Sequence, residues 1–237
     1  MPIVLRLSAV TELLPESPYH PDPVATGVIM PSRTACTCCG QERGYVYKGP
    51  VYTADEPGGP LCPWCIADGS AAERIDAHFT AGTRLGDDVP LEVFAAADRH
   101  TPGFTAWQEP QWIFHCGDST AFLAPAGSAG LAAHPEALET VRQETNGWGR
   151  PPDQLDHFPG SLDKDGETTA YLFRYRVCTA HLAYTDFAQA LHTSRTAPRT
   201  ASPTRESGVP ARRSCRDPAC HPQHTVHQVH RNQDRHE

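Results

Sequence analysis

Cys36-Thr-Cys-Cys-Gly40 and Cys62-Pro-Trp-Cys65 are the two stretches that decide the fold of this chain. Two residues separate Cys36 from Cys39 and Cys62 from Cys65, and 22 residues lie between the pairs. Two cysteines in such a turn can direct both sulfurs at one ion, and a second turn completes a tetrahedral shell. Gly40 supplies the permissive backbone that follows the first turn. The spacing therefore predicts one zinc ion bound by all four cysteines.

Two other interpretations of these cysteines stay open at the level of the sequence. They can be buried free thiols, or Cys62 and Cys65 can form a disulfide or a thioredoxin-like redox pair. The redox interpretation leaves the pair at Cys36 and Cys39 without a role. Cys38 is the odd cysteine of the group, and it is either a spare thiol or a replacement for Cys36 as a ligand.

Length, charge and apolar content narrow the class of protein. The 237 residues suffice for one domain with appendages, and no apolar run approaches the roughly 20 residues of a membrane-spanning helix. The formal net charge of -8 argues against a protein that binds nucleic acid with its whole surface. The nine cysteines stand mostly in tight groups and no cleavable leader is evident, so we expect a cytoplasmic protein.

The charge is divided unevenly along the chain. Residues 1–190 carry a net charge of -12, whereas residues 191–237 contain eight Arg, no Lys and four acidic residues. The second segment contains no aromatic residue, so it cannot bury enough apolar surface to order itself. We expect a loosely ordered extension at 1–17, a domain at 18–190 with its zinc-knuckle part at about 31–80, and a disordered tail at 191–237.

Periodicity predicts short strands mixed with helices. Tyr45–Tyr52 is rich in aromatic and β-branched residues around Gly-Pro, which predicts a hairpin. Helices are expected over 66–80, from near Pro90 with Leu91, Phe94 and Ala95 buried, and over 135–144. Strands are expected at 112–115, 170–176 and 182–184. A mixture without βαβ alternation predicts an α+β fold, in which a pair of cysteine turns, a hairpin and a helix resemble a treble-clef zinc finger.

Several longer motifs identify a family resemblance. They are Tyr19–Gly27, Cys38–Tyr45, Gly49–Tyr52 and Leu61–Ser70, with further matches as far as Phe187. In these motifs the chain resembles the CbrC family, an uncharacterised family of bacterial proteins named for tolerance to colicin E2. The resemblance implies a cytoplasmic protein with no established activity, of which one relative is linked with colicin tolerance, and it supplies no catalytic residues.

The chain departs from that family at a later strand. Family members have a third pair of cysteines there, whereas this chain keeps only Cys178. Cys178 can form a weak second metal site with Cys116 and His181, joined by His115, if their strands are adjacent. The alternative is that these thiols and histidines pack in the core.

Two classes of function remain open. The chain contains none of the common nucleotide or zinc-protease motifs. A shell of four cysteines has no open position for water, so we expect a zinc-stabilised module that binds another protein rather than nucleic acid. The alternative is an enzyme, a hydrolase or nuclease-like protein, with an Asp/His site outside the zinc. Asp68, Asp118 and Asp186 are then candidate general bases, although such residues more often cap helices and turns.

Overall fold

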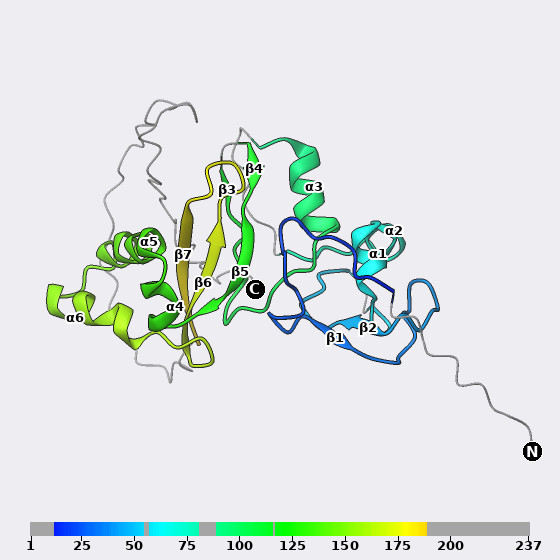
Figure 1. Ribbon diagram of the computed structural model, residues 1–237, viewed down its shortest axis with the longest axis horizontal. Coiled ribbons are helices and arrows are strands. Elements are labelled where there is room, and N and C mark those ends of the chain that lie inside the picture. Colours follow the sequence, from blue (N-terminus) through cyan, green and yellow to red (C-terminus); the bar gives the residue numbers. More distant parts are fainter. Residues whose placement is uncertain (1–11, 55–56, 81–88, 116, 189–237) are drawn as a thin grey trace, which may run out of the picture.

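The computed structural model describes residues 12–54, 57–80, 89–115 and 117–188, which form a mixed α/β fold (Figure 1). The tail at 191–237 lies outside the described residues, and so does the extension as far as residue 11. The elements in chain order are β1 (Ile29–Pro31), β2 (Tyr45–Tyr47), α1 (Pro63–Ala67), α2 (Ser70–Ile75), α3 (Leu91–Arg99), β3 (Phe114–His115), β4 (Asp118–Ser119), β5 (Ala121–Ala126), α4 (Ser128–Ala132), α5 (Pro135–Asn146), α6 (Pro152–His157), the 3-10 helix η1 (Phe158–Ser161), β6 (Thr168–Arg174) and β7 (His181–Phe187).

Residues 12–80 form one part of the molecule, which we call the knuckle part. In it β1 pairs antiparallel with β2, and α1 and α2 lie beside this small sheet (Figure 1). Its apolar cluster is made of strand and helix residues together with three buried cysteines, Cys36, Cys62 and Cys65. The cysteines therefore belong to the core of this part.

The expected hairpin at Tyr45–Tyr52 is wrong. Only Tyr45–Tyr47 is a strand, and its partner is β1, which precedes the cysteines. Tyr52 instead forms an isolated bridge with His78. Pro50 has no backbone N–H to donate to a ladder, and its carbonyl accepts a hydrogen bond from the Tyr47 hydroxyl at 2.8 Å. The Gly-Pro break thus separates two segments that pair with different partners.

The single helix expected over 66–80 is also wrong. The chain forms α1 and α2 there, separated by Gly69 in the left-handed conformation, with φ of 81°. Asp76 ends α2 with φ of 45°, and Phe79 lies beyond the helix in extended chain. The helical spacing of Ile75 and Phe79 was therefore accidental. The helix beginning near Pro90 is confirmed as α3, but Leu91 is exposed and not buried.

The sheet part, residues 101–188, contains the longer elements. Its antiparallel sheet has the order β5-β6-β7, and the register pairs Tyr171 with Tyr184 (Figure 1). Strands were expected for β6, β7 and β3 and are found, whereas β5 was missed. One apolar cluster includes Phe104, Trp112 and Phe173. A second cluster packs α4 and α5 against the same strands.

Helix α5 covers the free edge of strand β7 with three side chains spaced four residues apart. The backbone N–H groups of alternate β7 residues donate to Glu136, Thr140 and Glu144, at 3.0, 2.9 and 2.9 Å. Four residues of helix advance about 6 Å, close to two residues of strand, so the two spacings match. These contacts satisfy polar groups that an edge strand otherwise exposes.

The two parts meet through buried polar contacts and through Tyr19, which belongs to the apolar cluster of the sheet part. The N–H of Gly103 donates to the Tyr47 hydroxyl at 3.1 Å. The ring nitrogens of His20, which is fully buried, lie 2.7 Å from the Pro102 carbonyl and 2.7 Å from the Thr26 hydroxyl. Burial lowers the pKa of His20 to about 4, so the ring is neutral at ordinary pH.

Candidate metal centre

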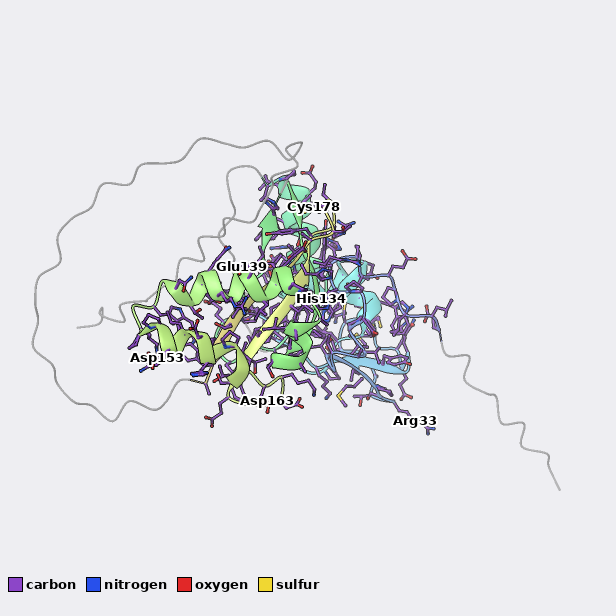
Figure 2. All side chains as sticks on the ribbon, turned by 60° about the vertical axis from the view of Figure 1, so that its left-hand side comes forward. Arg33, His134, Glu139, Asp153, Asp163 and Cys178 are labelled. Carbon is purple, nitrogen blue, oxygen red and sulfur yellow. The ribbon has the colours of Figure 1, made fainter. Side chains whose placement is uncertain are left out.

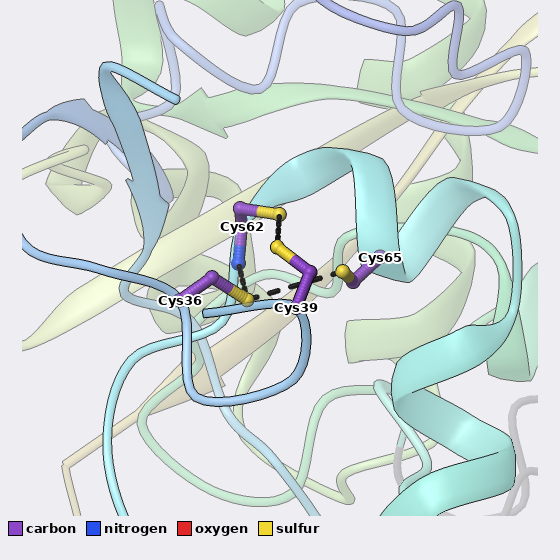
Figure 3. A group of neighbouring side chains, drawn as sticks. All are labelled: Cys36, Cys39, Cys62 and Cys65. Carbon is purple, nitrogen blue, oxygen red and sulfur yellow. Dashed lines mark hydrogen bonds between the residues drawn. The ribbon is translucent and has the colours of Figure 1, made fainter. Parts of the chain in front are cut away.

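The four paired cysteines come together in the knuckle part (Figure 3). Their sulfur atoms all lie within 4.8 Å of one another. The Cys36 and Cys65 sulfurs are 3.9 Å apart, and so are those of Cys39 and Cys62. Each of these short distances joins one cysteine turn to the other. Four sulfurs about 2.3 Å from a tetrahedral zinc ion would be about 3.8 Å from one another, which matches this spacing.

The first cysteine turn is closed by its own backbone. The N–H of Gly40 donates to the Cys36 carbonyl at 2.7 Å, and Gly40 has φ of 72°, which a side chain would strain. The N–H of Thr37 donates to the Pro60 carbonyl at 2.9 Å. This bond holds the first turn against the segment that leads to the second pair.

The second cysteine turn is the start of helix α1. Cys62 precedes the helix in an extended conformation, and Pro63 occupies the first helical position, where its fixed φ is favourable. Cys65 follows within the helix, so the change from extended chain to helix brings both sulfurs to one side. The first helical turn therefore presents the pair to the first cysteine turn.

Burial and hydrogen bonding act in opposite directions on these thiols. Burial raises the pKa of Cys36, but backbone hydrogen bonds from Cys39, Cys62 and Cys38 outweigh it and lower the pKa to about 7. The bond from Cys62 N–H to Cys36 Sγ is 3.2 Å long. Burial raises the pKa of Cys62 to about 11 and also raises that of Cys65. Holding all four as thiolates therefore requires a cation among them.

A positive charge stands beside the cluster. The Arg43 guanidinium lies 4.3 Å from the centroid of the Trp64 ring and interacts electrostatically with Cys62 and Cys39. Four thiolates around a divalent ion carry a net charge of about -2, which a neighbouring guanidinium offsets. Arg43 also forms an ion pair with Glu12. Glu12, which belongs to the expected N-terminal extension, is therefore tied to the arginine beside the cluster.

The donor set and the sulfur spacing fit a metal ion and argue against the redox alternative. All four residues are free cysteines, so Cys62 and Cys65 form no disulfide, and the two 3.9 Å distances join cysteines of different turns. The interpretation as buried free thiols explains their burial but not their convergence. The four cysteines can hold one metal ion.

Cys38 stands apart from the four. Its sulfur lies 3.7 Å from the Ser70 hydroxyl, and it does not belong to the group whose sulfurs converge. Cys36 and not Cys38 belongs to the group of four convergent sulfurs, so the alternative in which Cys38 replaces Cys36 is wrong. Cys38 is a natural control for experiments on the metal ligands.

The second site predicted from Cys116, Cys178 and His181 stays a prediction. Cys116 lies outside the described residues, and Cys178 is exposed in the turn before β7. The His181 ring lies 4.2 Å from the ring of His134, measured between centroids. Within the described ranges, the four cysteines are the potential metal ligands that the structure gathers.

Two of the candidate general bases have structural partners. Asp68 accepts hydrogen bonds from the Ser70 N–H and hydroxyl at 2.9 and 2.6 Å, which closes the turn before α2. Asp118 forms an ion pair with Arg176 at 2.8 Å and accepts the Tyr19 hydroxyl at 3.0 Å. Both carboxylates therefore fix local structure, as capping residues do.

The third candidate, Asp186, is likewise engaged with the protein. Asp186 accepts the backbone N–H groups of Gln108 and Phe187 at 2.8 and 2.9 Å, and burial raises its pKa. The His115 ring lies 4.5 Å from the ring of Tyr175, measured between centroids. His115 is the register partner of Asp118 in β3 and β4, whereas Asp68 lies between α1 and α2 and Asp186 lies on β7, so the three candidate bases stand on separate elements.

A histidine and aspartate pair was missed from the sequence. His78 Nδ1 lies 2.5 Å from a carboxylate oxygen of Asp98, whose other oxygen accepts the Thr80 hydroxyl at 2.8 Å. Asp98 is buried, whereas the His78 side chain is 38% exposed. His78 and Asp98 are 20 positions apart in the chain, so no local sequence pattern predicts that they pair.

Comparisons with known proteins place the chain among relatives of unknown activity. The model of the uncharacterised protein family UPF0167 matches residues 14–187. UPF0167 proteins of Mycobacterium bovis and Mycobacterium tuberculosis are each 49% identical over 176 residues, which is 74% of this chain and 94% of theirs. A UPF0167 protein of Pseudomonas aeruginosa is 49% identical over 122 residues, 48% of this chain and 65% of its own.

Two further findings complete these comparisons. No solved structure matches the chain significantly, so the likeness to a treble-clef finger stays a prediction. Among the described residues, none of the helices combines the length and the apolar character needed to cross a lipid bilayer. The sequence matches alone assign the family, and the chain belongs to the uncharacterised protein family UPF0167.

Proposed function

We propose that the four cysteines hold one structural zinc ion and that the protein acts by binding another protein. The observation that carries the proposal is the convergence of four cysteine sulfurs with tetrahedral spacing. Zinc bound in this way has no open position for a water molecule or a substrate. The ion then stabilises the knuckle part and performs no chemistry of its own.

Exposed apolar side chains support protein binding. Among the described residues, large apolar side chains stand in solvent at positions spread over several elements, namely Leu13, Val24, Met30, Leu91, Trp107, Val177 and Phe187. Aromatic and apolar side chains of this kind are enriched where proteins meet. The net charge of -8 disfavours nucleic acid as the partner because phosphate contacts need positive charge.

The resemblance to the CbrC family extends the proposal to a cellular role. We place the protein in the cytoplasm, where thiols remain reduced and free to bind zinc. Its partner would then act in tolerance to colicin E2. Zinc, compartment and tolerance are separate parts of the proposal, and each can be tested alone.

Affinity purification from the native host tests the proposal. The zinc-loaded full chain is the bait, Cys65→Ser is the variant that lacks a ligand, and Cys38→Ser is the matched control. We expect the wild type and Cys38→Ser to carry one zinc per chain and to retain the same partner, and Cys65→Ser to lose both. Retention of the partner by a zinc-free protein would contradict the link between the metal and the binding surface.

The enzyme remains the second candidate, and the pair of His78 and Asp98 favours it. A buried carboxylate that holds a half-exposed imidazole is an arrangement used for general bases. His78→Gln in the full chain separates the candidates. Loss of colicin tolerance in a folded His78→Gln protein that still binds its partner would favour catalysis, and an unchanged phenotype would favour the binding module.

A further inference from the structure

A surface of aromatic side chains lies at the end of the sheet where β6 begins and β7 ends. The Trp148 ring contacts the rings of Phe158 and Phe187, with centroids 4.9 and 6.2 Å apart. The Trp107 indole N–H donates to the Gly166 carbonyl at 3.0 Å, and Trp107 is 48% exposed. Trp148, Phe158 and Phe187 therefore meet on the α5 side of the sheet. Trp107 bonds the Thr169 hydroxyl at 3.2 Å and lies at the same end of the sheet on its other face.

Exposed carboxylates lie in the segments next to these rings. They are contributed by α6 and by the loop before β6, and they include Asp153, Asp163, Asp165 and Glu167. Figure 2 shows Asp153 at the left end of the molecule, Asp163 on its lower edge and Arg33 toward the right. Residues 148–167 contain five acidic residues against two basic ones. We call Trp148, Phe158, Phe187 and these four carboxylates the aromatic–acidic surface.

The same molecule shows how it holds an arginine elsewhere. The Arg176 guanidinium lies 4.7 Å from the centroid of the Tyr19 ring and pairs with Asp118 at 2.8 Å. Arg43 lies over Trp64 and also forms an ion pair with a carboxylate. In both cases an aromatic face and a carboxylate act together on one guanidinium. The aromatic–acidic surface offers the same kinds of group, and there the Arg150 guanidinium already lies 5.9 Å from the centroid of the Trp148 ring and Lys164 pairs with Asp165. Phe158, Phe187 and the other three carboxylates remain for further arginines.

We propose that the arginine-rich C-terminal segment, residues 191–237, occupies the aromatic–acidic surface. The chain reaches this segment from the surface itself, since β7 ends at Phe187 and the N–H of Ala188 donates to the Glu167 carbonyl at 2.9 Å. The segment carries eight arginines and no lysine, and the rest of the chain has a net charge of -12. Charge and chain connection point to the same occupant.

Chain length allows the contact without an ordered fold in the segment. Arg195 is seven residues beyond Ala188, a reach of about 23 Å when extended. Tethering to the same chain raises the effective concentration of the arginines to about the millimolar range. Contacts between side chains need no helix or strand, so the inference agrees with a composition that predicts disorder. It does not depend on the protein partner proposed above.

Limited digestion of the full chain with trypsin tests this inference, because trypsin cleaves after arginine. Asp153→Asn, Asp165→Asn and Glu167→Gln are combined in one variant that neutralises the surface. We expect this variant to lose tail arginine bonds about fivefold faster than the wild type at roughly 50 mM NaCl. The difference should vanish at high salt, where screening frees the tail of the wild type.

A matched variant controls for net charge. Glu42→Gln, Glu73→Gln and Glu92→Gln together remove the same three charges from exposed positions in the knuckle part and α3. This variant should digest like the wild type. Equal rates in all three proteins would show that the tail is not held, and faster digestion of both variants would show that net charge and not this surface holds it. Either result would overturn the inference.

Discussion

The knuckle part and the sheet part are held together by different means. In the knuckle part both strands have three residues and the helices have five and six, and three of the four clustered cysteines belong to the apolar core. In the sheet part β6 and β7 have seven residues each in continuous register, and α5 has 12. Short elements bury little surface, so we expect the first part to depend on the metal ion proposed for its four cysteines and the second on packing and hydrogen bonds.

Removing one of the four cysteines should give the largest difference between the two parts. Cys65→Ser leaves three sulfurs, and structural zinc contributes about 10 kcal/mol or more to the folding of small zinc domains. We expect zinc to be lost and amide hydrogens in β2 and α1 to exchange as in an unfolded chain. Amides of β6 should stay protected. Hydrogen exchange with mass spectrometry follows both regions in one sample.

Cys38→Ser controls for this experiment within the same turn. Its sulfur lies outside the convergent group, so the variant should keep its zinc and its exchange pattern. Equal loss of protection in β6 and β2 upon Cys65→Ser would mean that the two parts fold as one unit. The contrast between them would then be wrong.

The side-chain hydrogen bonds from α5 to the backbone of β7 have the corresponding stabilising role in the sheet part. The Thr140 hydroxyl is buried and bonds both the N–H and the carbonyl of Ala183, each at 2.9 Å. Thr140→Val keeps the shape but leaves these two backbone groups without that partner, so we expect a loss of about 2 kcal/mol in the free energy of unfolding. Urea denaturation measures it.

Thr145→Val is the control on the same helix. Its hydroxyl donates to the Arg142 carbonyl of its own helix, so its removal should cost less than about 1 kcal/mol. Equal losses in the two variants would show that the ladder to β7 adds no specific stability.

A smaller effect should appear as a pH dependence of the sheet part. Burial raises the pKa of Glu144 from 4.5 to about 7, although hydrogen bonds from Thr185 oppose the rise. The folded protein therefore holds this proton more tightly than the unfolded chain does. Glu144 contributes its full stabilisation below pH 4.5, and this contribution is lost as the pH rises through 7.

Glu144→Gln should remove this dependence and keep an oxygen for the Thr185 N–H. We expect the free energy of unfolding of the variant to be about 1–2 kcal/mol higher than that of the wild type at pH 8, and the difference to disappear near pH 5. Glu139→Gln, on the exposed side of α5, should show no such trend. A constant difference between Glu144→Gln and the wild type from pH 5 to 8 would refute the raised pKa.

The sequence predicted those features that local spacing alone determines. The grouping of Cys36, Cys39, Cys62 and Cys65 followed from two pairs at regular spacing, and α5 followed from a clear helical period that begins at Pro135. The hairpin at Tyr45–Tyr52 failed because the partner of β2 lies before the cysteines, at a distance that periodicity does not encode. The long helix failed because Gly69 breaks it.

Contacts between elements that are distant in the sequence could not be predicted from the sequence. Glu136, Thr140 and Glu144 lie four residues apart, which is ordinary for a helix, and only the position of β7 gives that spacing its role. The same holds for His78 and Asp98, which meet across two elements. The α5–β7 contacts and the pair of His78 and Asp98 both depend on which distant segments lie together in the fold.

X-ray absorption at the zinc edge identifies both the metal and its ligand atoms in the knuckle part. The reduced full chain is purified without added metal and its zinc content is measured on the same sample. We expect one zinc per chain with four sulfur neighbours at about 2.3 Å, from Cys36, Cys39, Cys62 and Cys65. Native, reduced protein without zinc, or zinc with nitrogen or oxygen neighbours in its first shell, would contradict the claim.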